Sequence, residues 1–459
     1  MFLNGNSSVA RLTWQLNEVN DILAAALKAR LKNHVALLPS LGHDKSERLA
    51  FVELDGIESA YQARKCGGRL AKALIADGAD SCQLPAPPEQ LSTEHYDAFL
   101  LGLSQGGYVD NRYRSKNQPE LAKLLGGNLS KSRREQLNTR AMSIAWARDR
   151  INEPAEDLGP AEFVQAAKSF LRGSGCKIRV IGEEGLEKLG AGCHLAVGRA
   201  SPRRPRILVV DWPGQGKASQ KRNFLALVGK GVTFDTGGLQ IKPGSAMSLM
   251  RKDMGGAATV TAAMKIIAQS NCSHPVRAYV PLADNAVDGS AFRPGDVLKA
   301  IDGTTVEIRH TDAEGRLLLA DAMCLARKEG AKRLVTVATL TGAALVALGR
   351  LHVPVMGDEE LINNLLNAAQ TIGELGWQLP LTSEHQAMVR GSVADLTNST
   401  EMPDAGTITA GAFLKHFADG KEFGHCDISP ASWMTSAHDL GPAGATGVWV
   451  DTLARFARY

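Results

Sequence analysis

The sequence lacks the signatures of several common protein classes. It has no C-x-x-C pair, and its seven cysteines are scattered, which argues against a disulfide framework and against a thiolate zinc site. No H-E-x-x-H, G-x-S-x-G or G-x-x-x-x-G-K-[ST] motif occurs. The longest uncharged apolar run, between Arg333 and Arg350, is sixteen residues long and contains three threonines. Such a run is too short and too polar to span a membrane.

The N-terminal residues, MFLNGNSSVARLTW, contain no basic segment followed by an apolar one, so no signal peptide is predicted. With 44% hydrophobic and 22% charged residues, the composition is that of a soluble globular protein, and the cytoplasm is the predicted location. Cys193 beside His194 is interpreted as a buried structural pair, because no other feature marks it as a nucleophile.

The pattern of strands and helices predicts an α/β protein of two domains. A boundary is expected where two prolines and a glycine interrupt residues 148–160, which gives a smaller α/β N-terminal domain, 1–147, and a larger domain, 148–459. In the larger domain, apolar strands alternate with helices, as in Phe224–Val228 followed by Gly256–Ser270. This alternation predicts a mixed, largely parallel central sheet flanked by helices.

The net charge of +4 is concentrated in the first 150 residues, where 20 basic residues face 16 acidic ones. The excess is densest from Arg112 to Arg150. A solvated helix face is one interpretation of this patch, and a nucleic-acid-binding N-terminal domain is the alternative.

Charged residues gather where predicted strands end and helices begin. Lys230, Asp235 and Lys242 follow Phe224–Val228, and Asp253 precedes the alanine-rich helix. Each has a simple structural interpretation: a helix cap for Asp253, for example, or a surface position for Lys242.

A third group, Asp312, Glu314 and Arg316, follows the predicted strand Thr305–Ile308. Thr311-x-x-Glu314 before an apolar run also fits a capping box. In an extended segment, however, Asp312 and Glu314 would project to the same side.

Gathering these carboxylates, lysines and the arginine in one place costs desolvation free energy unless their charges are compensated. Two divalent cations would balance four carboxylates, and oxygen-rich sites suit Mg²⁺, Mn²⁺ or Zn²⁺. The sequence therefore predicts a site for two metal ions at the carboxyl ends of the strands.

The motifs resemble those of the leucine aminopeptidase (cytosol aminopeptidase) family of dinuclear metallopeptidases. The resemblance covers the chain from about Arg148 to the C-terminus. It is carried by VGKGVTFDTGGLQIKP, MRKDMGGAA and TDAEGRLLLADA, with further matches in INEPAEDLGP, FRPGDV and TLTGA.

By position, the resemblance implies five ligands for the two metals. Asp235 and Glu314 would bridge the pair, and Lys230 would ligate as a neutral amine. Asp253 would complete the looser site with Lys230, and Asp312 would complete the tighter one.

The resemblance also implies how a peptide bond would be hydrolysed. A metal-activated water would attack, Lys242 would stabilise the oxyanion, and Arg316 would hold a bicarbonate acting as general base. Met250 matches a side-chain pocket position, which predicts a preference for apolar, leucine-like N-terminal residues.

Further implications are a homohexamer and short peptides with a free N-terminus as substrates. Another dinuclear amidohydrolase remains an alternative. His310 stands where family members usually carry Asn, and a structural role is favoured over a metal ligand or proton carrier.

Overall fold

The computed structural model describes residues 9–13, 35–39, 48–52, 57–79, 81–84, 87–89, 91–119, 123–126, 129–215, 223–402 and 404–459. The chain forms two compact units. The N-terminal unit comprises Met1–Ala145 with Gln370–Glu374 and Met434–Gly444, and the C-terminal unit comprises Trp146–Ala369, Leu375–Trp433 and Ala445–Tyr459. Two later segments thus join the N-terminal unit, a feature that the sequence pattern does not reveal.

The N-terminal unit is built on a five-stranded sheet with the order β2-β3-β1-β4-β5. Its strands pair in parallel except for β2 with β3. The strands are β1 (Val9–Thr13), β2 (Val35–Pro39), β3 (Arg48–Val52), β4 (Ser81–Leu84) and β5 (Lys123–Gly126).

Two helices of the N-terminal unit, α2 (Ala60–Ala76) and α3 (Thr93–Gly106), pack closely against each other. Glycines at their contact allow the backbones to approach. A Cβ built at Gly102 would lie 1.8 Å from the carbonyl oxygen of Arg64, and one at Gly67 would lie 2.0 Å from that of Phe99. At the N-terminus of α2, the hydroxyl of Ser59 accepts a hydrogen bond from the N–H of Gln62.

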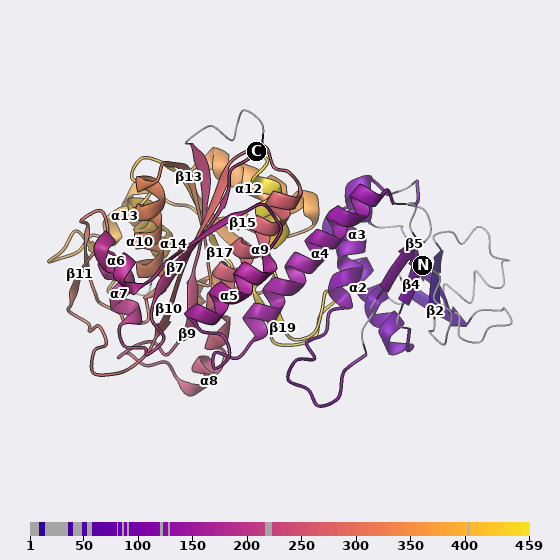
Figure 1. Cartoon of the computed structure of the whole chain (residues 1–459), viewed down its shortest axis with the longest axis horizontal. Coiled ribbons are helices and arrows are strands. Elements are labelled where there is room, and N and C mark those ends of the chain that lie inside the picture. Colours follow the sequence, from indigo (N-terminus) through magenta and orange to yellow (C-terminus); the bar gives the residue numbers. More distant parts are fainter. Residues whose placement is uncertain are drawn as a thin grey trace. The chain divides into compact units, whose positions relative to one another are not determined.

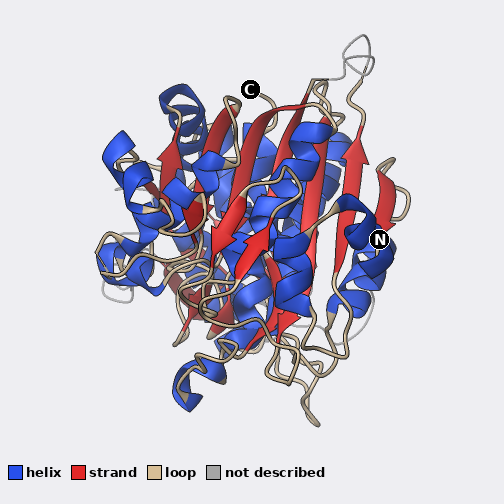
Figure 2. Ribbon diagram, turned by 90° about the vertical axis from the view of Figure 1, so that its left-hand side faces the viewer, coloured by secondary structure: helices blue, strands red, loops and turns tan. Residues whose placement is uncertain are grey.

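The C-terminal unit contains a nine-stranded mixed sheet (Figures 1 and 2). Its central strands β8, β10 and β13 are parallel to one another, β9 pairs in parallel with β10, and β17 pairs in parallel with β13. The predicted fold class is confirmed. The strands are β6 (Lys177–Ile181), β7 (Arg206–Trp212), β8 (Phe224–Gly229), β9 (Gly231–Asp235), β10 (Val276–Asn285), β13 (Ala331–Ala338), β14 (Val353–Gly357), β15 (Gly376–Gln378) and β17 (Glu422–Asp427).

Three short strands form a separate sheet in the C-terminal unit: β11 (Val297–Lys299), β12 (Thr305–Glu307) and β16 (Leu396–Thr397). The strand β12 pairs antiparallel with β11 and parallel with β16. The remaining strands are β18 (Trp433–Met434) and β19 (Gly444–Ala445).

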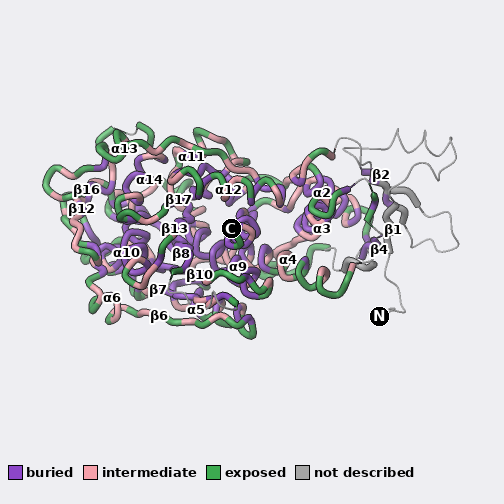
Figure 3. Tube along the Cα trace, turned by 90° about the horizontal axis from the view of Figure 1, so that it is seen from above, coloured by how far each residue is buried: buried purple, intermediate pink, exposed green. Residues whose placement is uncertain are grey.

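Helices cover both faces of the large sheet. On one face α10 packs against α7 and α14, and on the other α9 packs against α15 (Figure 1). The strand β8 is accordingly buried along its whole length, and β10 and β13 are buried along most of theirs (Figure 3). The helices described after α3 in the chain are α4 (Lys131–Asn152), α5 (Pro160–Phe170), α6 (Glu183–Leu189), α7 (Gly192–Gly198), α8 (Gly244–Met247), the 3₁₀ helix η2 (Met250–Met254), α9 (Gly255–Gln269), α10 (Gly315–Lys328), α11 (Gly342–Leu348), α12 (Glu359–Ile372), α13 (Ser383–Met388), α14 (Gly406–His416) and α15 (Val450–Phe456).

Two other expectations can be compared with the structure. Cys193 and His194 are fully buried, in agreement with a structural role. Among the described residues, no helix is both long and apolar enough to cross a membrane.

The close approach of α2 and α3 gives a first prediction. Gly102→Ala should destabilise the protein by about 1–3 kcal/mol, because the added methyl group overpacks the helix contact. Chemical denaturation should show the loss as a lower midpoint. Gly182→Ala is the control, since a Cβ there meets nothing within 4 Å. Equal stability of the two variants would contradict the packing argument.

Candidate functional site

Lys230 and Asp235 lie at the carboxyl ends of two consecutive strands, both of which pair in parallel with β10. Lys230 separates β8 from β9, and its N–H donates to the carbonyl of Val337 in β13 at 3.0 Å. Asp235 is the last residue of β9. Parallel strands end at one edge of the sheet, so their loops converge there. Both side chains are buried.

The loop after β9 returns the second lysine to the same edge. Gly237 and Gly238 have φ values of +88° and +67°, a backbone conformation that glycine adopts without strain. The N–H of Lys242 then donates to the carbonyl of Thr236 at 2.9 Å, which closes the loop. The Nζ of Lys242 lies 2.8 Å from Asp235 and also pairs with Asp312.

Asp253 belongs to η2, the short 3₁₀ helix that leads into α9. Its carboxylate lies 2.8 Å from the Nζ of Lys230 and accepts a hydrogen bond from the hydroxyl of Thr339 at 2.8 Å. Met250 is half-buried and lies three residues earlier in η2. Side chains three apart on a 3₁₀ helix are eclipsed, so Met250 and Asp253 share a face.

The segment from Arg309 to Glu314 is a turn, and α10 begins only at Gly315. The capping-box interpretation is therefore wrong: no side chain caps this helix, and the Thr311 hydroxyl instead donates to the carbonyl of Gly237 at 2.7 Å. The extended conformation expected for Asp312 and Glu314 is also wrong. The turn, not strand alternation, brings their carboxylates together.

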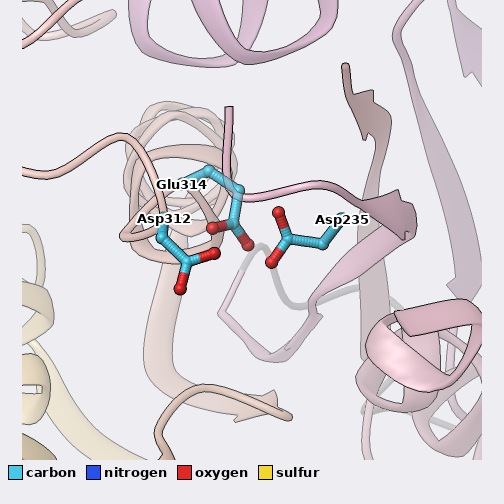
Figure 4. Close-up of side chains that lie close together, drawn as sticks. All are labelled: Asp235, Asp312 and Glu314. Atoms are coloured by element: carbon cyan, nitrogen blue, oxygen red, sulfur yellow. The ribbon is translucent and has the colours of Figure 1, made fainter. Parts of the chain in front are cut away.

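Asp235, Asp312 and Glu314 form a tight carboxylate cluster, with ligand oxygens within 4.8 Å of one another (Figure 4). Both oxygens of Glu314 are buried and make no hydrogen bond within the described part of the chain. Its one close cation among the ion pairs described there is Lys230, 2.9 Å away. Buried carboxylate oxygens without donors are costly, and divalent cations would satisfy them. The donor set thus fits hard metal ions.

The lysines and carboxylates of the cluster perturb one another strongly. Burial alone would lower the pKa of Lys230, but the charges of Asp253, Glu314 and Asp235 outweigh burial and raise it. Burial and neighbouring carboxylates raise the pKa values of Asp253 and Glu314. The neutral amine expected of Lys230 therefore requires a cation that displaces its proton.

Arg316 lies in the first turn of α10 and is buried. Its Nη1 donates to the backbone carbonyl of Asn398 at 2.8 Å, while its Nε makes no hydrogen bond within the described residues. Burial lowers the pKa of Arg316 to about 10. A guanidinium at this pKa stays charged near neutrality, so its unused donor fits a small anion.

His310 has a structural contact that agrees with the favoured interpretation. Its Nδ1 accepts the backbone N–H of Asp312 at 3.1 Å. This bond stabilises the turn before the carboxylates, and the ring is otherwise exposed.

Sequence reasoning missed Asn285, which joins two of the ligand loops. It is buried at the end of β10, and its Nδ2 donates to Asp235 at 2.8 Å and to the carbonyl of Thr311 at 3.2 Å. Its place at the end of an apolar strand is the one sequence signal that could have identified it. The structure thus brings together six of the seven charged residues named from the sequence, places Arg316 two residues after Glu314 at the start of α10, and adds an amide that orients Asp235.

Comparison with known proteins identifies similar sequences and structures. A family model described as "Cytosol aminopeptidase family, catalytic domain" matches residues 145–454. A probable cytosol aminopeptidase of Mycobacterium leprae is 38% identical over 85% of this chain and 76% of that protein. One of Geobacter sp. is 34% identical over 92% of this chain and 88% of that protein.

Two solved structures are similar over nearly the whole chain. The bottromycin maturation enzyme BotP in complex with Mn has a TM-score of 0.87 and 32% identity, covering 98% of both chains. The crystal structure of the cytosol aminopeptidase from Coxiella burnetii has a TM-score of 0.85 and 31% identity, covering 99% of this chain and 98% of that one.

The site predicts the effect of one added methyl group. A Cβ at Gly315 would lie 2.4 Å from the Cε and 2.6 Å from the Nζ of Lys230. Gly315→Ala should therefore displace the Lys230 amine and weaken metal binding by at least about tenfold. Equilibrium dialysis against Mn²⁺ measures this, with Gly289→Ala, where a Cβ meets nothing within 4 Å, as the control. Unchanged affinity in Gly315→Ala would contradict the role of Lys230.

Metal binding should also release protons. Lys230 has a raised pKa and is protonated near neutrality, and the raised pKa values of Asp253 and Glu314 keep part of their population protonated at lower pH. Because ligands must lose these protons, affinity for Mn²⁺ should increase from pH 6 to pH 8. Calorimetric titration in two buffers of different ionisation enthalpy counts the protons. An affinity independent of pH would show that these groups are not displaced.

Proposed function

Because this chain belongs to the cytosol aminopeptidase family and is a metal-dependent aminopeptidase, we propose that it removes the N-terminal residue from short peptides with two divalent cations. The family resemblance inferred from its motifs is thereby confirmed. The observation that carries the proposal is the convergence of Asp235, Asp312 and Glu314 beside two lysines. We assign the catalytic activity to the larger predicted domain, residues 148–459.

We assign five side chains as metal ligands. On the family resemblance, Asp235 and Glu314 would hold both cations; each lies in the carboxylate cluster and contacts a lysine. Lys230 and Asp253, which contact each other, would complete one site, and Asp312 the other. The donor set accepts Zn²⁺, Mn²⁺ or Mg²⁺. The bound Mn of the similar BotP structure supports manganese as one native candidate.

The chain's own residues have distinct parts in hydrolysis. When bound, the two cations activate a water molecule and polarise the scissile carbonyl. Lys242 pairs with Asp235 and Asp312 at the edge of the cluster, where its ammonium can donate to the developing oxyanion. Arg316 would hold a bicarbonate through its unused Nε, and that anion supplies the general base that these motifs lack.

Substrate preference follows from the surroundings of the ligands. Met250 shares a face of η2 with Asp253, so an apolar, leucine-like side chain would lie beside it. The free α-amine of the peptide would be held at the metal centre, which restricts cleavage to the first residue. A homohexamer in the cytoplasm is part of the same proposal, on the family resemblance.

The basic patch of the N-terminal unit is partly neutralised within the unit. Arg133 pairs with Asp97 at 2.6 Å, and Arg112 pairs with Asp110 at 2.9 Å. These pairs support the interpretation of a solvated, ion-paired surface. Nucleic-acid binding stays a prediction from charge alone.

Hydrolysis of leucine p-nitroanilide by metal-stripped protein, titrated with Mn²⁺ or Zn²⁺, tests the proposed function. Activity should return as two equivalents of metal bind. Glu314→Gln keeps the side-chain shape but removes its charge, so it should lower activity by more than about 100-fold.

N-acetyl-leucine p-nitroanilide is the matched substrate control. It should not be cleaved, because its amine is blocked. Cleavage of both substrates would indicate a general amidohydrolase, and cleavage of neither with any metal would refute the proposal.

A further inference from the structure

Asn398 is a fully buried residue that the proposed mechanism does not use. It follows β16, which lies beside β12 (Figure 3) and pairs with it in parallel in the small sheet. The metal-ligand turn follows β12, so the parallel pairing places Asn398 beside that turn. The backbone N–H of Asn398 extends the pairing by donating to the carbonyl of Glu307 at 3.0 Å.

The side-chain amide of Asn398 binds the turn from both of its ends. Its Oδ1 accepts the N–H groups of Arg309 and His310, at 2.9 and 3.2 Å. Its Nδ2 donates to the carbonyls of His310 and Ala313, at 2.7 and 3.4 Å. One amide therefore stabilises the backbone on both sides of Asp312 and directly before Glu314.

The main chain of Asn398 holds a second part of the site. Its carbonyl oxygen accepts the Nη1 of Arg316 at 2.8 Å. The Nε of the same guanidinium makes no hydrogen bond among the described residues. One residue thus contacts both the turn that carries two carboxylates and the arginine that follows them.

The position of Asn398 is itself fixed by hydrogen bonds between β12 and the residues that precede β16. The Oδ2 of Asp395 accepts the N–H and the hydroxyl of Thr305, at 2.8 and 2.7 Å. Glu307 accepts the N–H and hydroxyl of Ser392, at 3.0 and 2.9 Å. These bonds set the register between β12 and β16. The register in turn places Asn398 beside the turn that follows β12.

We propose that Asn398 is a positioning residue that fixes the turn bearing Asp312 and Glu314 and orients Arg316. The inference rests on the proposed roles of those three residues. It requires an amide, because only an amide offers an acceptor to two N–H groups and a donor to two carbonyls from one planar group. An aspartate would place a second acceptor against the carbonyls of His310 and Ala313, and a serine is too short to reach both ends.

The test uses the full-length protein and the variants Asn398→Asp and Asn398→Ser. Equilibrium dialysis measures Mn²⁺ affinity and stoichiometry, and kcat is measured at saturating Mn²⁺ with leucine p-nitroanilide. Residues that orient metal ligands typically affect affinity or activity by about 10- to 100-fold. Both variants should show a loss of that size in Mn²⁺ affinity, and a lower kcat when metal is saturating.

Asp358→Ala is the matched control, because it removes two hydrogen bonds of similar length, from the N–H of Phe423 at 2.7 Å and from the Nζ of Lys415 at 2.6 Å, at the start of β17 and away from the turn. It should lower the melting temperature and leave Mn²⁺ affinity unchanged. If it weakens Mn²⁺ binding as much as the Asn398 variants, their effect is general destabilisation and the inference is wrong. Wild-type affinity and kcat in either folded Asn398 variant would also overturn it. Failure of the wild-type protein to bind Mn²⁺ or to cleave the substrate would instead refute the proposed function, and this inference with it.

Discussion

The site depends on the compensation of negative charge in a buried place. Asp235, Asp253 and Glu314 are nearly inaccessible to solvent, and isolated carboxylates in such a position would be neutralised by protonation. Lys230 contacts Asp253 and Glu314, and Lys242 contacts Asp235, so two ammonium groups offset most of this charge. The same constraint explains the metal dependence of the family, because cations of higher charge compensate the cluster more fully than ammonium groups do.

The fold brings these charges together by ending parallel strands at one edge. The backbone of Lys230 is bonded to β13 through its N–H and to α9 through its carbonyl, which accepts from Ala257 at 2.7 Å. Close approach of α9 requires a glycine: a Cβ at Gly256 would lie 2.1 Å from the carbonyl of Val337. The small residues of MRKDMGGAA therefore allow α9 to pack closely against the sheet. This packing fixes the position of the Lys230 backbone at the edge of the sheet.

The side-chain amides of two asparagines fix the arrangement of the carboxylates, which charge attraction alone does not determine. A carboxylate cluster can relax in many directions, whereas hydrogen bonds to backbone groups select one arrangement. Asn285 ties Asp235 to the carbonyl of Thr311, and Asn398 holds the same turn from its other side. The turn between β12 and α10 is thus held by two amides from distant segments. The ligand geometry therefore depends on several loops together, because the hydrogen bonds of Asn285 and Asn398 join one segment to another.

The sequence by itself determined the fold class and the family, because strand–helix alternation and motif spacing are local properties. It placed Lys230 and Asp235 at strand ends, as the structure does. Only the tertiary structure decided how Asp312 and Glu314 converge: the expected helix cap and extended segment are both replaced by a turn. That turn is stabilised by Asn398, which lies more than 80 residues away in sequence. Such partners are invisible to periodicity and motif, because strand pairing between distant segments creates them.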